Sequence, residues 1–243
     1  MAQSPRPARG QNCGRLVADG ESGNPSMRCL LVVASLLLGS AWSSMAAEVT
    51  VHLSDGQGHA VNDAVVMLTT DAAPATAPVP ERPVTHIIDQ RNETFIPYVQ
   101  VLRPGDKVVF RNSDTTRHHV YSFAAIRTFE FVLRPGESSP ELSMDKTGIA
   151  AVGCNIHDHM IAYLFVSAVP ATTMSSHGGD AMLSHLAPGH YTAHVWHPQL
   201  HPGHPEPIQK VTIASDADVL HLAFTLSLMP DPRMSMDREH LDY

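Results

Sequence analysis

The chain has 243 residues, of which 43% are hydrophobic and 16% charged, with 19 Pro and 15 Gly. This length suits one or two globular domains, and the scarcity of runs with helical periodicity favours an all-β fold. The formal net charge of −8 disfavours nucleic acid and anionic membrane surfaces as partners.

Residues 1–46 have the pattern of a leader that ends in a signal peptide. Arg28 precedes an apolar run over residues 29–38, and small residues up to Ala46 fit a cleavage site directly after it. Met27 is an alternative start of translation. A membrane anchor is the other interpretation, but the apolar run is shorter than the roughly 20 residues that a spanning helix needs. We therefore expect a periplasmic or otherwise exported protein without stable membrane insertion.

Removal of the leader sharpens the charge and the cysteine count. It takes away four of the 16 Lys+Arg and two of the 24 Asp+Glu, which leaves 12 against 22 and a net charge of −10. An acidic protein favours basic proteins or cations as partners. Cys154 becomes the single cysteine, in a compartment where cysteines usually pair, and so its presence needs an explanation.

Short strands separated by turns are predicted along most of the remaining chain. Residues 48–70 suggest two strands around a turn, and an Ala/Pro-rich linker follows over 73–83. From 84 to 169 short strands and turns alternate, including a strand over 95–102 that meets the turn Arg103–Asp106. This pattern is typical of a β-sandwich or barrel.

Beyond Pro170 the pattern consists of further strands up to residue 228. The stretch contains a Pro-Gly turn, an alternating strand around Tyr191, and two closing strands. Residues 229–243 are charged and are expected to form a disordered tail.

The residues with the clearest chemical meaning lie in the segment CNIHDHM. Cys154, His157 and Met160 have the spacing C-x2-H-x2-M on a short loop between two apolar strands, which allows all three to converge. A thiolate with imidazoles selects copper, and a thioether is the usual long axial contact of an electron-transfer site. One more imidazole is needed, and His118 or His119 offers it at the start of a strand. Taken singly, each residue could also have a structural role without metal; a buried Cys, for example, often packs as a small hydrophobic side chain.

Residues 84–169 resemble a cupredoxin of the plastocyanin and amicyanin group. The resemblance rests on FIPYVQVLRPGDKVVFRNSD, on RHHV where the family has Pro-His-Asn-Val, and on the short loop CNIHDHM. They also resemble exported proteins often labelled methylamine-utilisation proteins. The resemblance implies a Greek-key β-sandwich with one type 1 (blue) copper, held by His118, Cys154, His157 and, axially, Met160.

Two positions depart from the family pattern. His119 stands where the family has an Asn that ties the two ligand loops together, and it is either a donor behind the ligands or faces outward. His159 stands at a loop position that is more often apolar or aromatic. If His159 were exposed beside His157, it would make the electron-exit surface sensitive to pH, and the alternative is an inert surface residue.

Two pieces on either side of the cupredoxin-like segment resemble a carboxypeptidase-regulatory-like (transthyretin-like) β-sandwich. They are EVTVHLSDGQGHAVNDAVVML and LAPGHYTAHVWHP. We therefore expect a second, small β-sandwich formed by residues 47–72 and 173–228, with a cupredoxin domain over 84–172 inserted into it. The alternative is a single cupredoxin elaborated with extra edge strands.

A second group of histidines lies between residues 190 and 204. It comprises His190, His194, His197, His201 and His204, partly on a strand and partly on a Pro-rich loop. A weak second Cu or Zn site in the His190–His204 region is one interpretation, and a solvated loop without metal is the other.

The leading hypothesis for function is a one-electron carrier that cycles between Cu(I) and Cu(II), and not an enzyme. Its redox partner would be a basic protein such as a cytochrome or a dehydrogenase. The alternative is a periplasmic protein that handles or senses copper and passes on the metal rather than electrons. An enzyme of the nitrite-reductase kind would need a second, His-only centre. A binuclear copper centre within the chain is excluded, because it needs two bridging cysteines and Cys154 is single.

Overall fold

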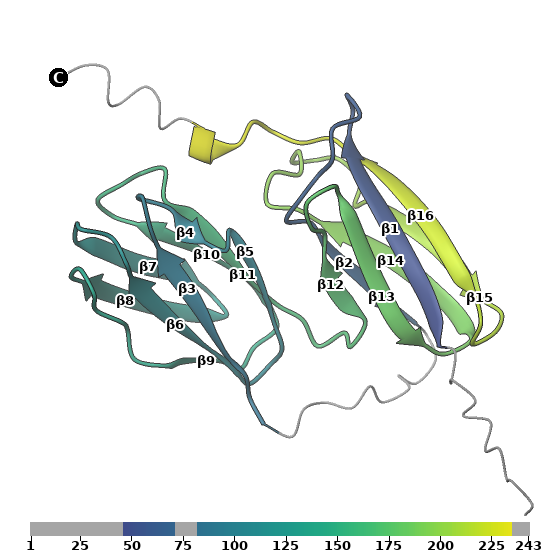
Figure 1. Cartoon of the computed structure of the whole chain (residues 1–243), viewed down its shortest axis with the longest axis horizontal. Helices are drawn as coiled ribbons and strands as arrows, with labels where there is room; N and C mark the ends of the chain where they lie inside the picture. The colour runs from purple at the N-terminus through teal and green to yellow at the C-terminus, as the bar shows by residue number, and fades with distance from the viewer. Residues whose placement is uncertain (1–45, 71–81, 235–243) are drawn as a thin grey trace, which may run out of the picture. The chain divides into compact units, whose positions relative to one another are not determined.

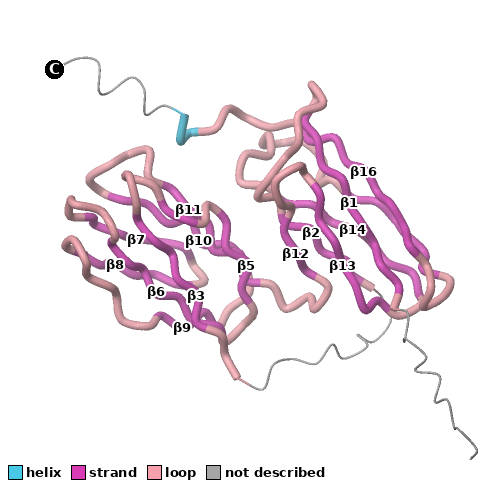
Figure 2. Tube along the Cα trace, in the orientation of Figure 1, coloured by secondary structure: helices cyan, strands magenta, loops and turns pink. Residues whose placement is uncertain are grey.

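The computed structural model describes residues 46–70 and 82–234. Within these residues all named elements are strands, numbered β1 to β16, and the one helical feature is a short 3₁₀ turn over 232–234 (Figure 2). The all-β prediction is confirmed. Most of the predicted leader and linker lies outside the described residues.

The cupredoxin-like segment forms a β-sandwich of two sheets (Figure 1). The first sheet has the order β4 (Phe95–Ile96), β3 (Thr85–Gln90), β6 (Asp106–Asn112), β9 (Leu142–Met144). The second has the order β5 (Val99–Leu102), β11 (Ile161–Val166), β10 (Gly148–Cys154), β7 (His118–Ala124), β8 (Arg127–Leu133). The predicted cupredoxin-like β-sandwich is thus confirmed.

The core between these sheets follows from the alternation of side chains along the strands. In β6 the burial pattern alternates strictly, with Val108 and Phe110 pointing inward, as expected when one face of a sheet is covered. The Phe110 ring contacts Phe95 from the same sheet and Phe129 from the opposite one. This core fixes the ends of β6, β7 and β10, where the candidate site lies.

One predicted strand is divided in two. Residues 95–102 were expected to be continuous, but the chain breaks at Pro97, so that β4 joins the first sheet and β5 the second. Proline cannot donate a hydrogen bond to a neighbouring strand, which makes it a natural point for a strand to leave its sheet. The predicted turn at Arg103–Asp106 is present, closed by the hydrogen bond from the Asp106 N–H to the Arg103 carbonyl (3.0 Å).

The flanking segments form the second, small sandwich. One sheet has the order β13 (Asp180–Leu186), β1 (Ala47–Asp55), β16 (Val219–Leu226), and the other β12 (Thr172–Met174), β2 (Val65–Thr69), β14 (Gly189–Trp196), β15 (Ile208–Ile213). The N-terminal strand β1 lies between two strands from the far end of the chain, antiparallel to β13 and parallel to β16. The resemblance of these segments to carboxypeptidase-regulatory-like domains stays a prediction.

The beginning of the expected tail keeps contacts with the fold. The Met229 N–H donates to the Gln199 carbonyl (2.8 Å), and within the tail Arg233 forms an ion pair with Asp231 (2.6 Å). Residues 229–234 belong to the described part of the chain, and residues 235–243 of the predicted tail lie outside it.

Two adjacent glycines differ in how closely they approach β1 of the flanking sandwich. Gly178 and Gly179 both have positive φ (106° and 79°), but only at Gly179 would an added Cβ meet backbone, 2.3 Å from the Leu53 carbonyl oxygen. We expect Gly178→Ala to lower the free energy of unfolding by about 1–2 kcal/mol, the cost of positive φ. Gly179→Ala should cost clearly more, because β1 must also move. Urea unfolding of both variants measures this, and equal losses would contradict it.

Candidate metal centre

Two paired strands bring the first two candidate ligands to one end of the cupredoxin-like sandwich. His118 begins β7 and Cys154 ends β10, and these strands are antiparallel neighbours in which Cys154 is paired with Val120. Because antiparallel strands run in opposite directions, the start of one lies beside the end of the other. The two residues share this end although 36 positions separate them in the chain.

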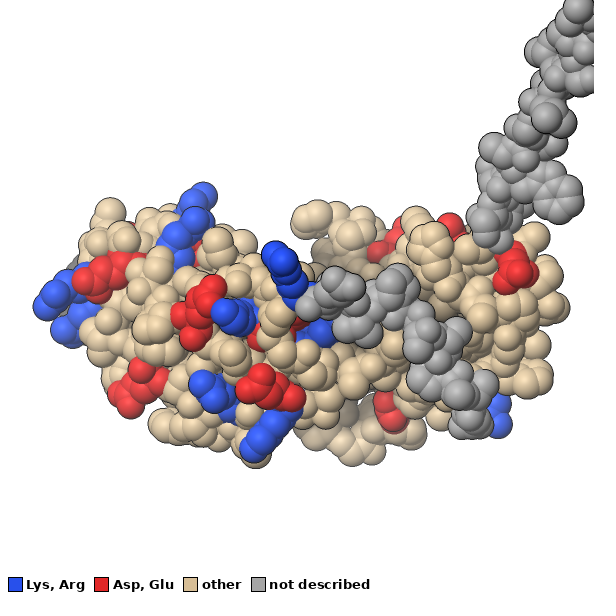
Figure 3. All heavy atoms as spheres, turned by 90° about the horizontal axis from the view of Figure 1, so that it is seen from below, with Lys and Arg blue, Asp and Glu red and all other residues tan. Residues whose placement is uncertain are grey.

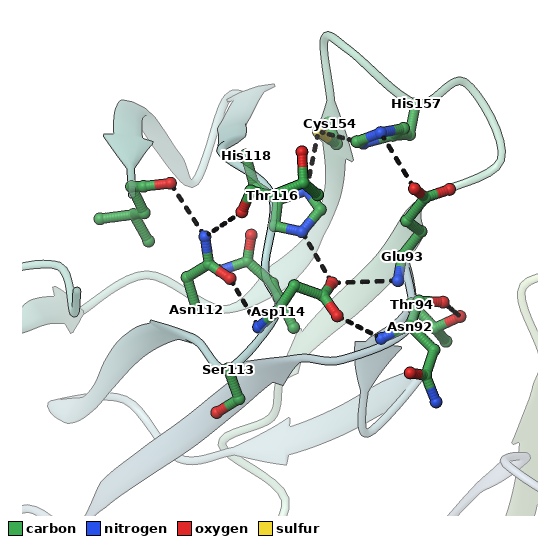
Figure 4. A network of polar contacts seen from close by, with 12 residues as sticks. Asn92, Glu93, Thr94, Asn112, Ser113, Asp114, Thr116, His118, Cys154 and His157 are labelled. Atoms are coloured by element: carbon green, nitrogen blue, oxygen red, sulfur yellow. Dashed lines mark hydrogen bonds and ion pairs between the residues drawn. The ribbon is translucent and has the colours of Figure 1, made fainter. Parts of the chain in front are cut away.

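The loop after Cys154 turns back on itself and brings in the third candidate ligand, His157. The Cys154 N–H donates to the Met160 carbonyl (3.2 Å), and the Met160 N–H donates to the His157 carbonyl (3.0 Å). These two bonds close the loop between β10 and β11 and direct the His157 ring toward Cys154 (Figure 4). The loop is thus shaped by its own backbone.

Three donor atoms converge in this arrangement. The Cys154 Sγ lies 3.8 Å from Nδ1 of His118 and 3.7 Å from Nδ1 of His157. Within the described parts of the chain, this is the one group of three or more His, Cys, Asp or Glu side chains whose possible ligand atoms all lie within 4.8 Å of one another. His118 is fully buried and Cys154 is 4% exposed.

The separations fit a metal ion bound by all three atoms. Metal–sulfur bonds of about 2.3 Å and metal–nitrogen bonds of about 2.0 Å, at about 120° to one another, place sulfur and nitrogen about 3.7 Å apart. Two imidazoles and one thiolate in a trigonal arrangement are the donor set of an electron-transfer copper site. The chemistry and the spacing of the residues therefore fit copper.

Met160 is brought to the same region. Its side chain is 2% exposed and belongs to the same buried cluster as Cys154. Its backbone closes the ligand loop, as described above. Its thioether as the axial ligand stays a prediction.

Asp114 holds the His118 ring from behind. Its Oδ2 lies 2.8 Å from Nε2 of His118, which leaves Nδ1 free to face Cys154 (Figure 4). A carboxylate on the far nitrogen of a metal-binding imidazole fixes the tautomer and the orientation of the ring and raises its basicity. The sequence analysis missed this residue, although its position four residues before His118 was visible in the sequence.

Asn112 shapes the turn that carries Asp114. Its side chain is fully buried, donates to the carbonyls of Thr116 and Leu133 (2.8 and 3.0 Å) and accepts from the Asp114 N–H (2.9 Å). All of its polar atoms are used by backbone groups, so it fixes the turn between β6 and β7.

Local contacts shift the pKa values of the grouped side chains. Burial raises the pKa of the Cys154 thiol, but hydrogen bonds with His118, with the backbone of Ile156 and His119 and with His157 outweigh it and lower the pKa to about 6. For His118, burial lowers the pKa, but the contacts with Cys154 and Asp114 raise it overall. Without metal the pair therefore tends toward thiolate and imidazolium.

A second carboxylate, Glu93, was also missed. One of its carboxylate oxygens lies 3.5 Å from Nε2 of His157, and the other lies 3.8 Å from Nε2 of His159. Both are ion-pair contacts. It lies on the turn between β3 and β4, far in sequence from the ligand loop, and no local pattern marks it.

The structure gives both departures from the family pattern specific contacts. The His119 carbonyl accepts a hydrogen bond from the Asn155 N–H (3.0 Å), and its ring pairs with Glu130, so His119 does link the two ligand loops through its backbone. The His159 side chain is 9% exposed, so the condition for an exposed, pH-sensitive His159 is not met.

The histidines between residues 190 and 204 do not gather into one group. His190 contacts Thr212, His194 contacts Thr69 and Glu206, and the His201 and His204 rings lie 5.3 Å apart. His197 is buried, which lowers its pKa to about 4. A second metal in this region stays a prediction.

Comparisons with known proteins add the following. Scans against family models and curated proteins found no match. Cupredoxins are among the solved structures that this chain resembles. A purple cupredoxin from Nitrosopumilus maritimus matches at 21% identity and TM-score 0.31, over 35% of this chain and 99% of its own. An amicyanin from Paracoccus versutus matches at 16% identity and TM-score 0.31, over 42% and 98%. A Cu-containing nitrite reductase from Thermus scotoductus matches at 25% identity and TM-score 0.30, over 41% of this chain and 25% of its own.

The described residues contain no helix of the length and hydrophobicity that a membrane crossing requires.

The buried Asn112 gives a test of how the site is held. Asn112→Ala removes the side-chain donor to the carbonyls of Thr116 and Leu133 and the acceptor of the Asp114 N–H, so we expect a loss of about 1–3 kcal/mol in the free energy of unfolding. Asn155→Ala, at an exposed position of the ligand loop, should change it by less than about 0.5 kcal/mol. Urea unfolding of the copper-free variants measures both values. Similar effects of the two substitutions would contradict the structural role of Asn112.

The lowered pKa of Cys154 gives a prediction for pH. In the copper-free protein, the ultraviolet absorbance of the thiolate should appear with a midpoint near pH 6, against an ordinary value of 9.0. Between these two pH values the unfolded chain keeps the thiol proton and the folded chain has lost it. The contribution of the thiolate to the free energy of unfolding is therefore complete above the unfolded pKa and is lost as pH falls through the folded pKa. Cys154→Ser supplies the baseline, and a midpoint that does not rise on unfolding in urea would refute the shift.

Proposed function

We propose that the protein is an exported type 1 copper protein that carries single electrons. His118, Cys154 and His157 would be the strong ligands and Met160 the axial one. The observation that supports this most directly is the convergence of Cys154 Sγ with the two Nδ1 atoms at 3.7 and 3.8 Å.

Copper, when bound, supplies the one-electron chemistry, and the chain supplies a rigid, water-poor holder. Asp114 keeps the His118 ring in place, and the backbone bonds of Met160 keep the loop closed. Ligands held by a β-scaffold have little freedom to rearrange, which suits a centre that must accept both oxidation states. Met160 would supply a fourth protein ligand, and a metal held by four protein side chains would favour a carrier over an enzyme.

Burial also favours electron transfer over copper handling. The side chains of His118 and Cys154 are almost inaccessible, and the His157 side chain is 17% exposed. A protein that passes copper to a partner needs ligands that the partner can reach. An electron, in contrast, can cross one covering layer of side chains.

The location and the partner are inferred from the sequence. The apolar run and small residues before Ala47 support export to the periplasm, and the excess of acidic residues supports a basic redox partner such as a cytochrome or dehydrogenase. The face of the molecule drawn in Figure 3 carries acidic and basic side chains interspersed. The proposed preference for a basic partner therefore rests on net charge.

A copper titration tests the proposal. Cu(II) added to the purified protein should give an intense visible charge-transfer band that saturates at one equivalent, with the EPR spectrum of a type 1 site. Cys154→Ser should abolish the band, because the charge transfer originates on the thiolate.

His119→Gln is the matched control, since His119 adjoins His118 but lies outside the converging group. It should keep the band. A colourless, weakly bound copper that is indifferent to Cys154→Ser would refute the proposal. Rapid loss of copper to a competing chelator from a blue protein would instead favour copper handling.

A further inference from the structure

The turn between β3 and β4 has an unusual backbone. Asn92 and Glu93 are consecutive residues other than glycine with positive φ, both 52°. Asn tolerates this left-handed conformation, but Glu has no such preference, and its side chain clashes with its own backbone there. A strained position that persists is held by the structure around it.

Asp114 provides that hold. Its Oδ1 accepts from the Asn92 N–H (2.5 Å) and its Oδ2 from the Glu93 N–H (3.0 Å), and the same Oδ2 contacts the His118 ring (2.8 Å). The carboxylate that orients one proposed ligand thus also fixes the strained turn. The position of Glu93 is therefore tied to that of His118 (Figure 4).

The turn places the Glu93 carboxylate against the other proposed imidazole ligand. It lies 3.5 Å from Nε2 of His157, whose Nδ1 faces Cys154. On its other side it lies 3.8 Å from Nε2 of His159, a buried atom without a hydrogen-bond partner. The Glu93 carboxylate thus bridges the Nε2 atoms of the two rings, and its side chain is only 30% exposed, so water screens its charge incompletely.

We propose that Glu93 is a positioning residue of the metal centre, whose carboxylate keeps Nδ1 of His157 turned toward Cys154 and stabilises the oxidised form of the centre. The inference rests on the proposed copper function and goes beyond it, because it states what sets the reduction potential. Each imidazole then has one carboxylate at its far nitrogen, Asp114 for His118 and Glu93 for His157. Two negative charges so close to the ligands favour Cu(II) over Cu(I), which lowers the potential.

The decisive variant is Glu93→Gln, which keeps the shape and the polar end of the side chain and removes the charge. We expect the equilibrium constant for reduction of the copper to increase about tenfold. For one electron this is a rise of about 59 mV in the Cu(II)/Cu(I) potential. Redox titration of the copper-loaded full chain at constant pH measures it. The visible band and the type 1 EPR spectrum should persist, since no ligand is changed.

Glu130→Gln is the matched control. It removes the same charge from another Glu–His pair, with His119, which lies beside His118 but is not one of the three converging residues. Because Glu130 is 63% exposed, its removal should shift the equilibrium by about twofold or less. Equal shifts of the potential in the two variants, or no shift in Glu93→Gln, would overturn the inference. If the blue band persisted in these variants, the proposed copper function would still stand. Failure of the parent protein to form the band would refute the copper function itself.

A second variant separates a role at the metal from a role in the fold. Glu93→Gly removes the carboxylate and suits a φ of 52°. We expect the potential to rise at least as much as in Glu93→Gln, while the melting temperature of the copper-free protein stays the same or increases. A lower melting temperature with an unchanged potential would show that Glu93 serves the fold and would overturn the inference.

Discussion

The Asp114 carboxylate connects the parts of this site more than any other group. It accepts hydrogen bonds from the amides of Asn92 and Glu93 and contacts the His118 ring. Burial raises its pKa, but the hydrogen bonds from Glu93, His118 and Asn92 outweigh this and lower the pKa overall, so the group stays charged at neutral pH. One partly exposed charge thus orients a proposed ligand and anchors the turn that carries Glu93. Both effects depend on the Asn112 side chain, which holds Asp114 in place.

The sheets provide the rest of the site through pairing alone. Because β7 and β10 are antiparallel neighbours, His118 and Cys154 meet without any special loop, and only the short turn to Met160 is needed to add His157. A buried thiolate and imidazole without metal are costly to place in a core unless they satisfy each other. Their mutual contact, together with Asp114, lets the folded chain hold the group in position before an ion binds.

The sequence was sufficient for the features encoded locally. The all-β class followed from short strands and turns, and the spacing of Cys154, His157 and Met160 pointed to the loop on which Cys154 and His157 converge. His118 could be chosen over His119 only through the family resemblance. Glu93 could not be predicted, because its contact with His157 joins segments more than 60 residues apart through a strained turn. The division of the strand at Pro97 was visible in principle, since proline lacks the N–H that a continuous strand needs.

The order of strands in the flanking sandwich has a consequence for biosynthesis. The strands of the cupredoxin-like sandwich are complete once Val166 has been made, whereas β1, made first, has no neighbour until β13 and β16 follow. During synthesis the apolar strand with Val49, Val51 and Leu53 is therefore made before either of its neighbours, whereas the inserted sandwich already has all its strands. An unpaired apolar strand is prone to associate with other chains. Both edges of β1 are covered only when β13 and β16 have been made, so the flanking sandwich cannot close before the chain is nearly complete.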